Sequence, residues 1–157
     1  MRRLLMTALV AALVGGVIGG LSLASASTAR DRHVRQIRVL EIQTRQTSVD
    51  LGKKGFSPGD EFMFTSLLKS LDGKRVVGHT SVVCTAVLQN MADCNGTGWL
   101  PGGTVRVGQT LGDEPNSVLA IVGGTGRYRG AGGQVFTHPL NKEGTRSRDI
   151  IQLILPH

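Results

Sequence analysis

Short runs of alternating apolar and polar residues, each bounded by turn residues, limit the fold of this sequence more than any other feature. The first run is IRVLEIQTRQ, and the turn Ser57-Pro58-Gly59 precedes the second. A period of two is the pattern of a half-buried strand, whereas an amphipathic helix repeats about every 3.6 residues. No segment after Ala26 shows an apolar stripe of helical period. The runs lie at 37–46, 60–68, 75–89, 94–99, 104–110, 117–123, 130–140 and 146–156.

The even spacing of these runs predicts an all-β domain, built as an up-and-down antiparallel sheet of about eight strands. A strongly twisted sheet of this size closes into a barrel, because closure removes the exposed edges that promote aggregation. The interior of such a barrel is filled by side chains or holds one small ligand. We therefore expect an eight-stranded antiparallel β-barrel at residues 37–157, preceded by a flexible segment at 27–36.

The N-terminus has the pattern of a secretory signal peptide at residues 1–26. Arg2 and Arg3 form a basic start, a long apolar stretch follows, and Ala24-Ser25-Ala26 is a small-residue cleavage pattern. The alternative is an uncleaved signal anchor, since about 20 apolar residues can span a bilayer. Both interpretations place the chain after Ala26 outside the cell, and only the second keeps it at the membrane.

The positive charge of the chain does not indicate a nucleic-acid partner. The formal net charge is +7, and much of the excess lies in TARDRHVRQIR (28–38), ahead of most of the predicted strands. Proteins that bind single-stranded RNA on a sheet carry clustered aromatic residues, and only 4% of this sequence is aromatic. We expect a solvated N-terminal segment and no nucleic-acid binding.

The two cysteines, Cys84 and Cys94, are predicted to form a disulfide. An isolated pair in an exported protein is most often bonded, and a short hairpin between these two positions would bring them together. The four histidines show no metal-ligand spacing with the cysteines or with one another. We expect no metal site.

The glycine-rich stretch AIVGGTGRYRGAGGQVF (120–136) follows an apolar run, as a nucleotide-binding turn does. A dinucleotide fingerprint needs a helix after its glycines, whereas Gly132 and Gly133 disfavour a helix and Val135 and Phe136 favour a strand. The spacing of the glycines also differs from G-x-G-x-x-G, and the lysine–serine pair of a P-loop is missing. We interpret the stretch as a tight connection between two strands, and expect no cofactor.

Four segments resemble the allene oxide cyclase and dirigent protein superfamily, in the same order along the chain. VLAIVGGTGRYRGAGGQV is similar to the glycine hairpin of that superfamily, and PGDEFMFTSLL to its GD-x-x-x-F strand. GKRVVGHTSVVC resembles a cyclase strand that ends in cysteine, and GGTVRVGQ resembles the strand before the hairpin. The resemblance implies an eight-stranded barrel with an apolar lumen, usually assembled as a homotrimer.

The same resemblance implies a site in the lumen. In the cyclases a glutamate on the first strand, followed two residues later by an amide, faces the cavity, and Glu41 and Gln43 match these positions. Ser66 stands where the cyclases have an asparagine, and Phe62 and Phe64 are expected to line the wall on the same strand. Residues Val82, Trp99 and Phe136 are expected in the core or the cavity wall.

The alternation alone leaves the direction of Glu41 open. Leu40 and Ile42 would be the natural inward residues of a filled barrel, and Glu41 would then form a surface pair with Arg45. If Glu41 faces an apolar lumen, burial favours its neutral form, so that it can exchange protons or stabilise positive charge.

The function expected from the sequence is a secreted barrel that binds a small apolar molecule and directs its cyclisation or stereoselective coupling. Catalysis would need no cofactor, because it would come from holding a reactive conformer in a dry space. Two alternatives stay open: a carrier that leaves its ligand unchanged, and an envelope protein whose barrel is filled by side chains. The filled barrel predicts no cavity of about 300 Å³ or more.

Overall fold

The computed structural model describes residues 33–112, 114 and 116–156. The predicted signal peptide, its cleavage point and residues 27–32 lie outside this part of the chain. Among the residues that it covers, no helix has the length and apolar character needed to cross a membrane.

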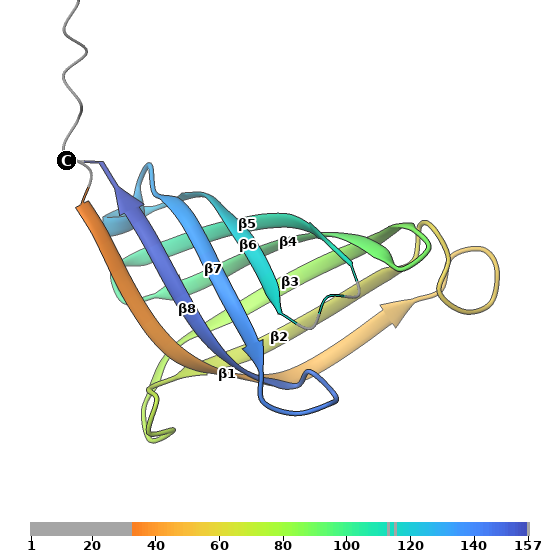
Figure 1. Ribbon diagram of the computed structural model, residues 1–157, viewed down its shortest axis with the longest axis horizontal. Coiled ribbons are helices and arrows are strands. Elements are labelled where there is room, and N and C mark those ends of the chain that lie inside the picture. The colour runs from red at the N-terminus through yellow and green to blue at the C-terminus, as the bar shows by residue number, and fades with distance from the viewer. Residues whose placement is uncertain (1–32, 113, 115, 157) are drawn as a thin grey trace, which may run out of the picture.

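The protein is a closed barrel of eight antiparallel strands, each paired with its neighbours in the sequence, and β8 pairs with β1 to complete the circle (Figure 1). A single turn of 3₁₀ helix, η1, lies between β6 and β7. The elements are β1 (His33–Val49), β2 (Glu61–Lys69), β3 (Val76–Leu88), β4 (Met91–Leu100), β5 (Gly103–Leu111), β6 (Ser117–Gly124), η1 (Gly126–Tyr128), β7 (Gly132–Pro139) and β8 (Arg146–Leu155). The all-β prediction and the strand order are confirmed.

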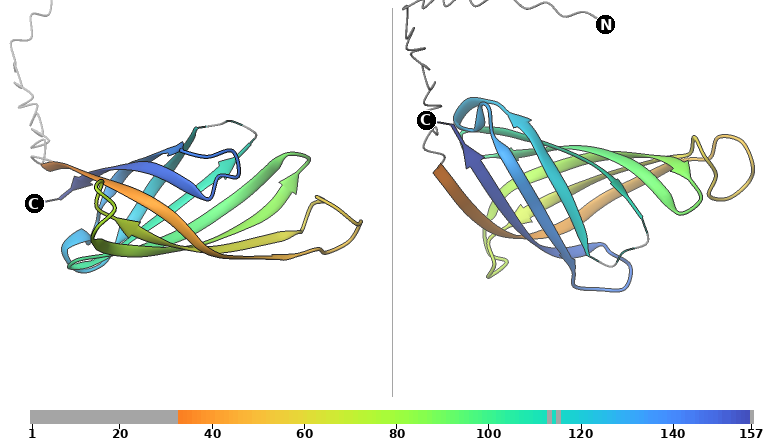
Figure 2. Two further views of the ribbon diagram at one scale, coloured as in Figure 1. Left: turned by 90° about the horizontal axis from the view of Figure 1, so that it is seen from below. Right: turned by 45° about the horizontal axis from the view of Figure 1, so that its top comes forward.

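Strand β1 is the longest strand and joins the two sides of the barrel. Residues 33–42 pair with β8, whereas residues 40–49 pair with β2, and the register shifts between Gln43 and Arg45. This bulge bends β1 so that its second half runs along β2 towards the far end of the barrel (Figure 2). The strand begins at His33, before the expected start at residue 37, because β8 extends to Leu155 and supplies the pairing partner.

One end of the barrel is closed by packed side chains, and this closed end carries the β2–β3, β4–β5 and β6–β7 connections. Tyr128 of η1 is 2% exposed and donates a hydrogen bond from its hydroxyl to the carbonyl of Pro101 at 3.1 Å. The other buried core residues are Val39, Leu68, Leu100, Val105, Ile121, Ala131, Val135, Ile151 and Leu153. The packed core therefore fills the lumen on the side of η1.

The glycine-rich stretch is a tight connection between two strands, as the sequence predicts. Its position in a turn favours an exposed Tyr128, but the structure buries that side chain in the barrel. Gly126 adopts a positive φ of 58°, which glycine tolerates without steric cost. At Gly124 a Cβ atom would lie only 2.5 Å from the carbonyl oxygens of Thr104 and Tyr128. The absence of side chains thus lets the turn fold tightly against β5.

Cys84 and Cys94 face each other on β3 and β4 and form the predicted disulfide. Both side chains point into the barrel, because the buried residues of β4, namely Cys94, Gly96 and Leu100, all lie on one face of the strand. Trp99 lies on the opposite face, 38% exposed.

The expectation that Trp99 and Phe136 belong to the core or cavity wall is wrong. Trp99 stacks on His79 outside the barrel, with ring centroids 4.7 Å apart and planes inclined by 14°. On β7, Val135 belongs to the core and Thr137 lines the lumen, so the alternation turns Phe136 outward. A large aromatic side chain predicts burial in general, but in a thin barrel wall the strand register decides its direction.

Candidate functional site

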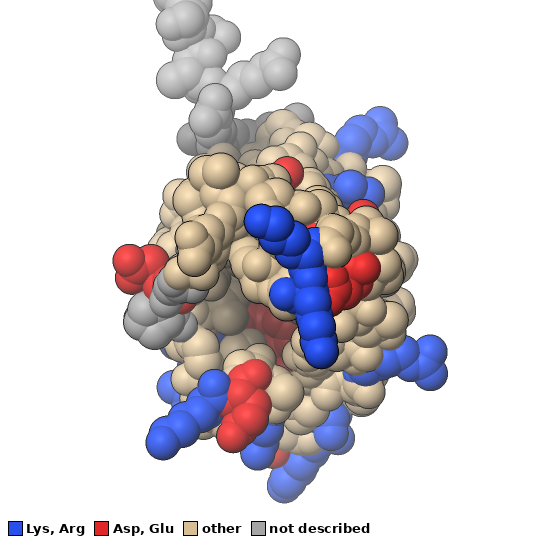
Figure 3. Space-filling model, turned by 90° about the vertical axis from the view of Figure 1, so that its right-hand side faces the viewer, with Lys and Arg blue, Asp and Glu red and all other residues tan. Residues whose placement is uncertain are grey.

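A pocket of about 320 Å³ occupies the half of the barrel that the core leaves unfilled. It opens at the end that carries the β1–β2, β3–β4, β5–β6 and β7–β8 connections, which we call the open end. Figure 3 looks onto this end and shows a hollow with acidic surface inside it. The pocket contradicts the filled-barrel alternative, which requires that no cavity of about 300 Å³ be present.

The five residues that the resemblance predicts for the site in the lumen all line this pocket. Glu41 and Gln43 come from β1, and Phe62, Phe64 and Ser66 come from alternate positions of β2. The remaining lining residues are Gln46, Val82, Cys84, Cys94, Leu111, Ser117, Leu119, Thr137, Gly144, Thr145 and Ser147. The wall is therefore mixed: an aromatic and aliphatic surface carries hydroxyl and amide groups at a few places.

Glu41 faces the lumen, so the surface pair with Arg45 is the wrong alternative. Its neighbour Val39, on the same face of β1, is 1% exposed and belongs to the core. The hydroxyl of Thr80 on β3 donates a hydrogen bond to Glu41 Oε1 at 2.5 Å. This bond fixes the direction of the carboxyl group at the depth where the core ends and the hollow begins.

The amide of Gln43 lies nearer the open end and is held by a second amide. Gln43 Nε2 donates a hydrogen bond to Gln46 Oε1 at 2.8 Å, across the bulge of β1. Ser66, on the neighbouring strand, is 2% exposed and lies opposite Gln43 in the register. Both groups can orient polar atoms of a ligand that enters from the open end.

A second carboxyl group, Asp149 of β8, lies beside Glu41 and was not found from the sequence. In the register of β1 and β8, Ser147 stands opposite Glu41 and Asp149 stands opposite Val39. Both Glu41 and Asp149 therefore point inward, one pair apart along the strands. Asp149 is 3% exposed, and its Oδ1 accepts a hydrogen bond from the Ser147 hydroxyl at 2.8 Å.

Burial, followed by the charge of Glu41 and a hydrogen bond with it, raises the pKa of Asp149 to about 8. Hydrogen bonds from Ser147 and Thr137 act in the opposite direction and lower the pKa, but they are smaller effects. Two carboxyl groups this close do not ionise together easily, because each charge disfavours the other. At neutral pH Asp149 is therefore mainly protonated and can donate a proton.

The acid pair lies between two spaces inside the barrel. A smaller cavity of about 70 Å³ lies deeper and is lined by both Glu41 and Asp149, together with Thr80 and apolar side chains such as Leu68 and Ile151. Glu41 lines this cavity and also the larger pocket. A ligand in the large pocket thus meets Glu41 directly and can reach Asp149 through the deeper space.

One signal in the sequence points to Asp149. In RSRDIIQLILP, the residues on one face of the predicted strand are Ser147, Asp149, Ile151 and Leu153, so the aspartate shares its face with two aliphatic residues. A lone acid on the apolar face of a strand indicates either a partner or a function. Which acid it meets depends on the closure of β8 onto β1, and the chain order does not show that pairing.

Within the ranges that the structure covers, no group of three or more histidine, cysteine, aspartate and glutamate side chains could hold a metal ion. The chemistry that this arrangement offers is proton transfer. A protonated carboxyl group and its neighbour can give and take a proton at adjacent points of one ligand.

No family model matches the chain, and neither does any curated protein. Solved structures do match. A pyocyanin demethylase is 22% identical, with a TM-score of 0.66 over 75% of this chain and 99% of that one. The Diels-Alderase AbmU from Streptomyces koyangensis is 14% identical, with a TM-score of 0.67 over 82% and 71%. The pterocarpan synthase dirigent protein PsPTS1 is 17% identical, with a TM-score of 0.62 over 80% and 96%.

These likenesses show the fold. The protein has the same barrel fold as these three proteins, and the resemblance of its four sequence segments to the dirigent and allene oxide cyclase superfamily predicts that fold. The same architecture carries demethylation, cycloaddition and dirigent activity in the matched proteins, so the reaction of this chain has to be argued from its own site.

Proposed function

We propose that this barrel binds a small, largely apolar organic molecule and directs a ring closure or stereoselective coupling of it. The observation that carries the proposal is the place of Glu41. It lines a pocket of about 320 Å³ in the open half of the barrel and shares a proton-bearing pair with Asp149. Small-molecule sites are typically apolar clefts of roughly 300–1,000 Å³ with a few placed polar groups, and this pocket fits the lower end of that range.

The wall of the pocket supports a positional role. Phe62, Phe64, Val82 and Leu119 offer a dry surface on which a folded conformer of the ligand is favoured over an extended one. Holding two reacting ends of one molecule close together can supply several kcal/mol of the barrier without a cofactor. Gln43 and Ser66 would orient the polar atoms of the ligand.

The acid pair supports a proton-transfer role. Asp149 donates its proton to the ligand as the new bond forms, and Glu41 accepts one from the neighbouring carbon. The proton then returns from Glu41 to Asp149 through the hydrogen bond that joins them. No proton is gained or lost in the cycle, so the pair is restored after each turnover and an isomerisation needs no further reactant.

The large pocket and the acid pair favour this function. The proposal also includes export of the protein, its assembly as a homotrimer and the catalytic role of Glu41. The disulfide between Cys84 and Cys94 agrees with an oxidising compartment. A carrier that leaves its ligand unchanged is the rival, and it differs from the proposal only in turnover.

The test is conversion followed by mass spectrometry. Purified protein is incubated with an organic extract of the organism that produces it, and compounds are compared before and after by liquid chromatography. Ring closure is expected to change the retention time of a compound without changing its mass. Coupling instead gives a new mass.

Two variants and a control make this test specific. Glu41→Gln and Asp149→Asn remove the proton transfer and keep the size of each side chain, so conversion should fall at least about 100-fold, the usual contribution of acid–base catalysis. Asp93→Asn changes the same charge at an exposed position of β4 and should leave conversion unchanged. Recovery of bound but unchanged compounds by all four proteins would identify a carrier and contradict the proposal.

A further inference from the structure

The described ionisable residues that line the path into the barrel are all acidic. Glu41 and Asp149 line the lumen, and Asp50 and Asp60 line a groove of about 230 Å³ at the open end. Across these three pockets, and counting only residues that the structure describes, the lining contains no lysine, arginine or histidine. The whole chain has 18 basic and 11 acidic residues, so the lumen has the opposite sign to the protein.

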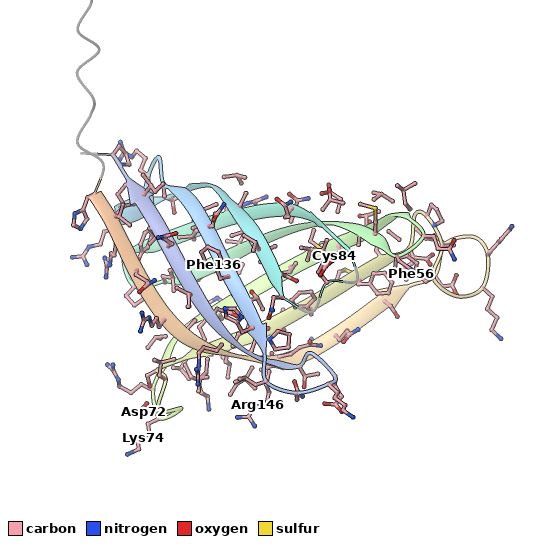
Figure 4. The ribbon with its side chains drawn as sticks, in the orientation of Figure 1. Phe56, Asp72, Lys74, Cys84, Phe136 and Arg146 are labelled. Atoms are coloured by element: carbon pink, nitrogen blue, oxygen red, sulfur yellow. A yellow bond between two sulfur atoms is a disulfide. The ribbon has the colours of Figure 1, made fainter. Side chains whose placement is uncertain are left out.

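The basic residues nearest the site are directed away by the strand register. On β8, the inward positions are Ser147 and Asp149, so Arg146 and Arg148 face outward. Figure 4 shows Arg146 outside the barrel, below the end of β7. On β1, the bulge after Gln43 leaves Arg45 exposed. The acid pair therefore has no internal positive partner among the residues that line its two cavities.

The other groups that face the pair are uncharged. Thr80 from β3, Thr137 from β7 and Ser147 from β8 supply hydroxyl groups. The other residues that line the deep cavity are aliphatic, apart from Thr97 and Gly98. A negative charge in such a space is poorly solvated. A positive ligand would stabilise it, and a negative ligand would be repelled by it.

An aromatic surface leads from the open end to this charge. Phe56 stacks on Phe62, with ring centroids 5.7 Å apart and planes inclined by 14°. Phe62 lines both the groove and the large pocket, and Phe64 follows on the same face of β2. Three of the four phenylalanines of the sequence thus line the path, and Phe56 lies at the loop of the open end (Figure 4). The faces of aromatic rings attract cations.

The two acids of the groove serve the loop itself. Asp60 accepts hydrogen bonds from the backbone of Leu51 at 2.7 Å and of Ser57 at 2.6 Å, and Asp50 accepts one from Gly55 at 3.2 Å. These bonds stabilise the β1–β2 connection. The acids that can select a ligand in the lumen by its charge are therefore Glu41 and Asp149.

We propose that the lumen is selective for a small, flat organic cation with a delocalised charge, such as an N-alkylated heteroaromatic ring, and that it excludes organic carboxylates. The inference deepens the proposed function because it assigns the substrate class of the same site. It concerns binding and does not require turnover.

The charge of Glu41 attracts the cation while Asp149 keeps its proton at neutral pH, so the proton donor of the proposed reaction is retained. Above about pH 8 Asp149 ionises as well, and the affinity for a cation should rise further.

The experiment compares three probes of one shape: N-methylacridinium, acridine and acridine-9-carboxylate. Isothermal titration at pH 8 should give a dissociation constant at least about tenfold lower for the cation than for acridine, and no measurable binding of the carboxylate. Titration of the cation in two buffers of different ionisation enthalpy at pH 7 should give the same heat, because Asp149 keeps its proton when the cation binds.

The variant Glu41→Gln should lose the preference for the cation and keep the binding of acridine. The variant Asp93→Asn makes the same change of charge on the outer face of β4 and should keep the preference. Near-ultraviolet circular dichroism confirms that both variants are folded.

Equal binding of cation and acridine, tighter binding of the carboxylate, or no binding of any probe overturns the inference. Each of these results leaves the proposed function intact if Glu41→Gln still abolishes conversion in the extract. A clear cation preference with no conversion in the extract supports the inference and counts against the proposed reaction.

Discussion

Replacing Asp149 by asparagine should change how the stability of the protein depends on pH. In the folded state the pKa of Asp149 is raised from 3.8 to about 8 by burial and by Glu41, whereas in the unfolded chain it returns to its ordinary value. Between these two values the folded protein holds a proton that the unfolded chain has released. The free energy of unfolding therefore falls as the pH rises from about 4 to about 8, and the contribution of Asp149 is lost above 8.

The size of the effect follows from the same two values. Each tenfold change in proton affinity is worth about 1.4 kcal/mol, so a rise of the pKa from 3.8 to about 8 corresponds to a loss on the order of 6 kcal/mol. The asparagine variant resembles the protonated aspartate, because its amide can still donate towards Glu41 and its oxygen can accept from Ser147. It should match the wild type near pH 4 and become more stable than the wild type as the pH rises from there to about 8.

Urea unfolding of the oxidised protein, followed by the fluorescence of Trp99, measures the free energy of unfolding of both proteins at steps of 0.5 pH units from pH 4 to pH 9. Asp72→Asn is the control: Asp72 lies in the exposed β2–β3 turn (Figure 4), and hydrogen bonds from Ser70 and Lys74 lower its pKa. Its titration lies below this range, so the slope should equal that of the wild type. A difference between wild type and Asp149→Asn that varies by less than about 1 kcal/mol over this range refutes a buried acid pair.

Two further predictions concern the scaffold. Replacing both Cys84 and Cys94 by alanine removes a short cross-link and should lower the unfolding free energy by roughly 2.5–3 kcal/mol, measured by urea unfolding; an unchanged midpoint would contradict a role for the bond in stability. Gly124→Ala places a Cβ atom 2.5 Å from two backbone oxygens and should lower the melting temperature strongly or prevent folding. Gly132→Ala meets no atom within 4 Å and should melt like the wild type, so equal losses in the two variants would show that the packing around Gly124 is not tight.

The fold could be predicted from the sequence because strand patterns are local. A period of two shows each strand and the two faces that it offers, and the turn residues between the strands leave little room for long crossovers. The disulfide could also be predicted, since both cysteines lie on neighbouring strands joined by a short hairpin.

The site could be predicted only in part. Glu41, Gln43, Phe62, Phe64 and Ser66 were placed in the lumen by their resemblance to a known superfamily, and the structure brings them around one pocket. Their period alone was ambiguous on β1, because the apolar Leu40 and Ile42 alternate with Glu41 and would themselves suit an inward face. Their roles remain part of the proposed function.

The amino-acid sequence by itself determined that this chain forms an antiparallel barrel, that its glycine-rich stretch is a turn, and that its two cysteines join. The tertiary structure alone decided that Glu41 points inward, that Asp149 stands beside it, and that Trp99 and Phe136 point outward. The physical reason is closure: β8 pairs with β1 across more than a hundred residues of chain, and no local pattern specifies which side chains that pairing brings together. The acid pair exists because the first and last strands of the barrel meet.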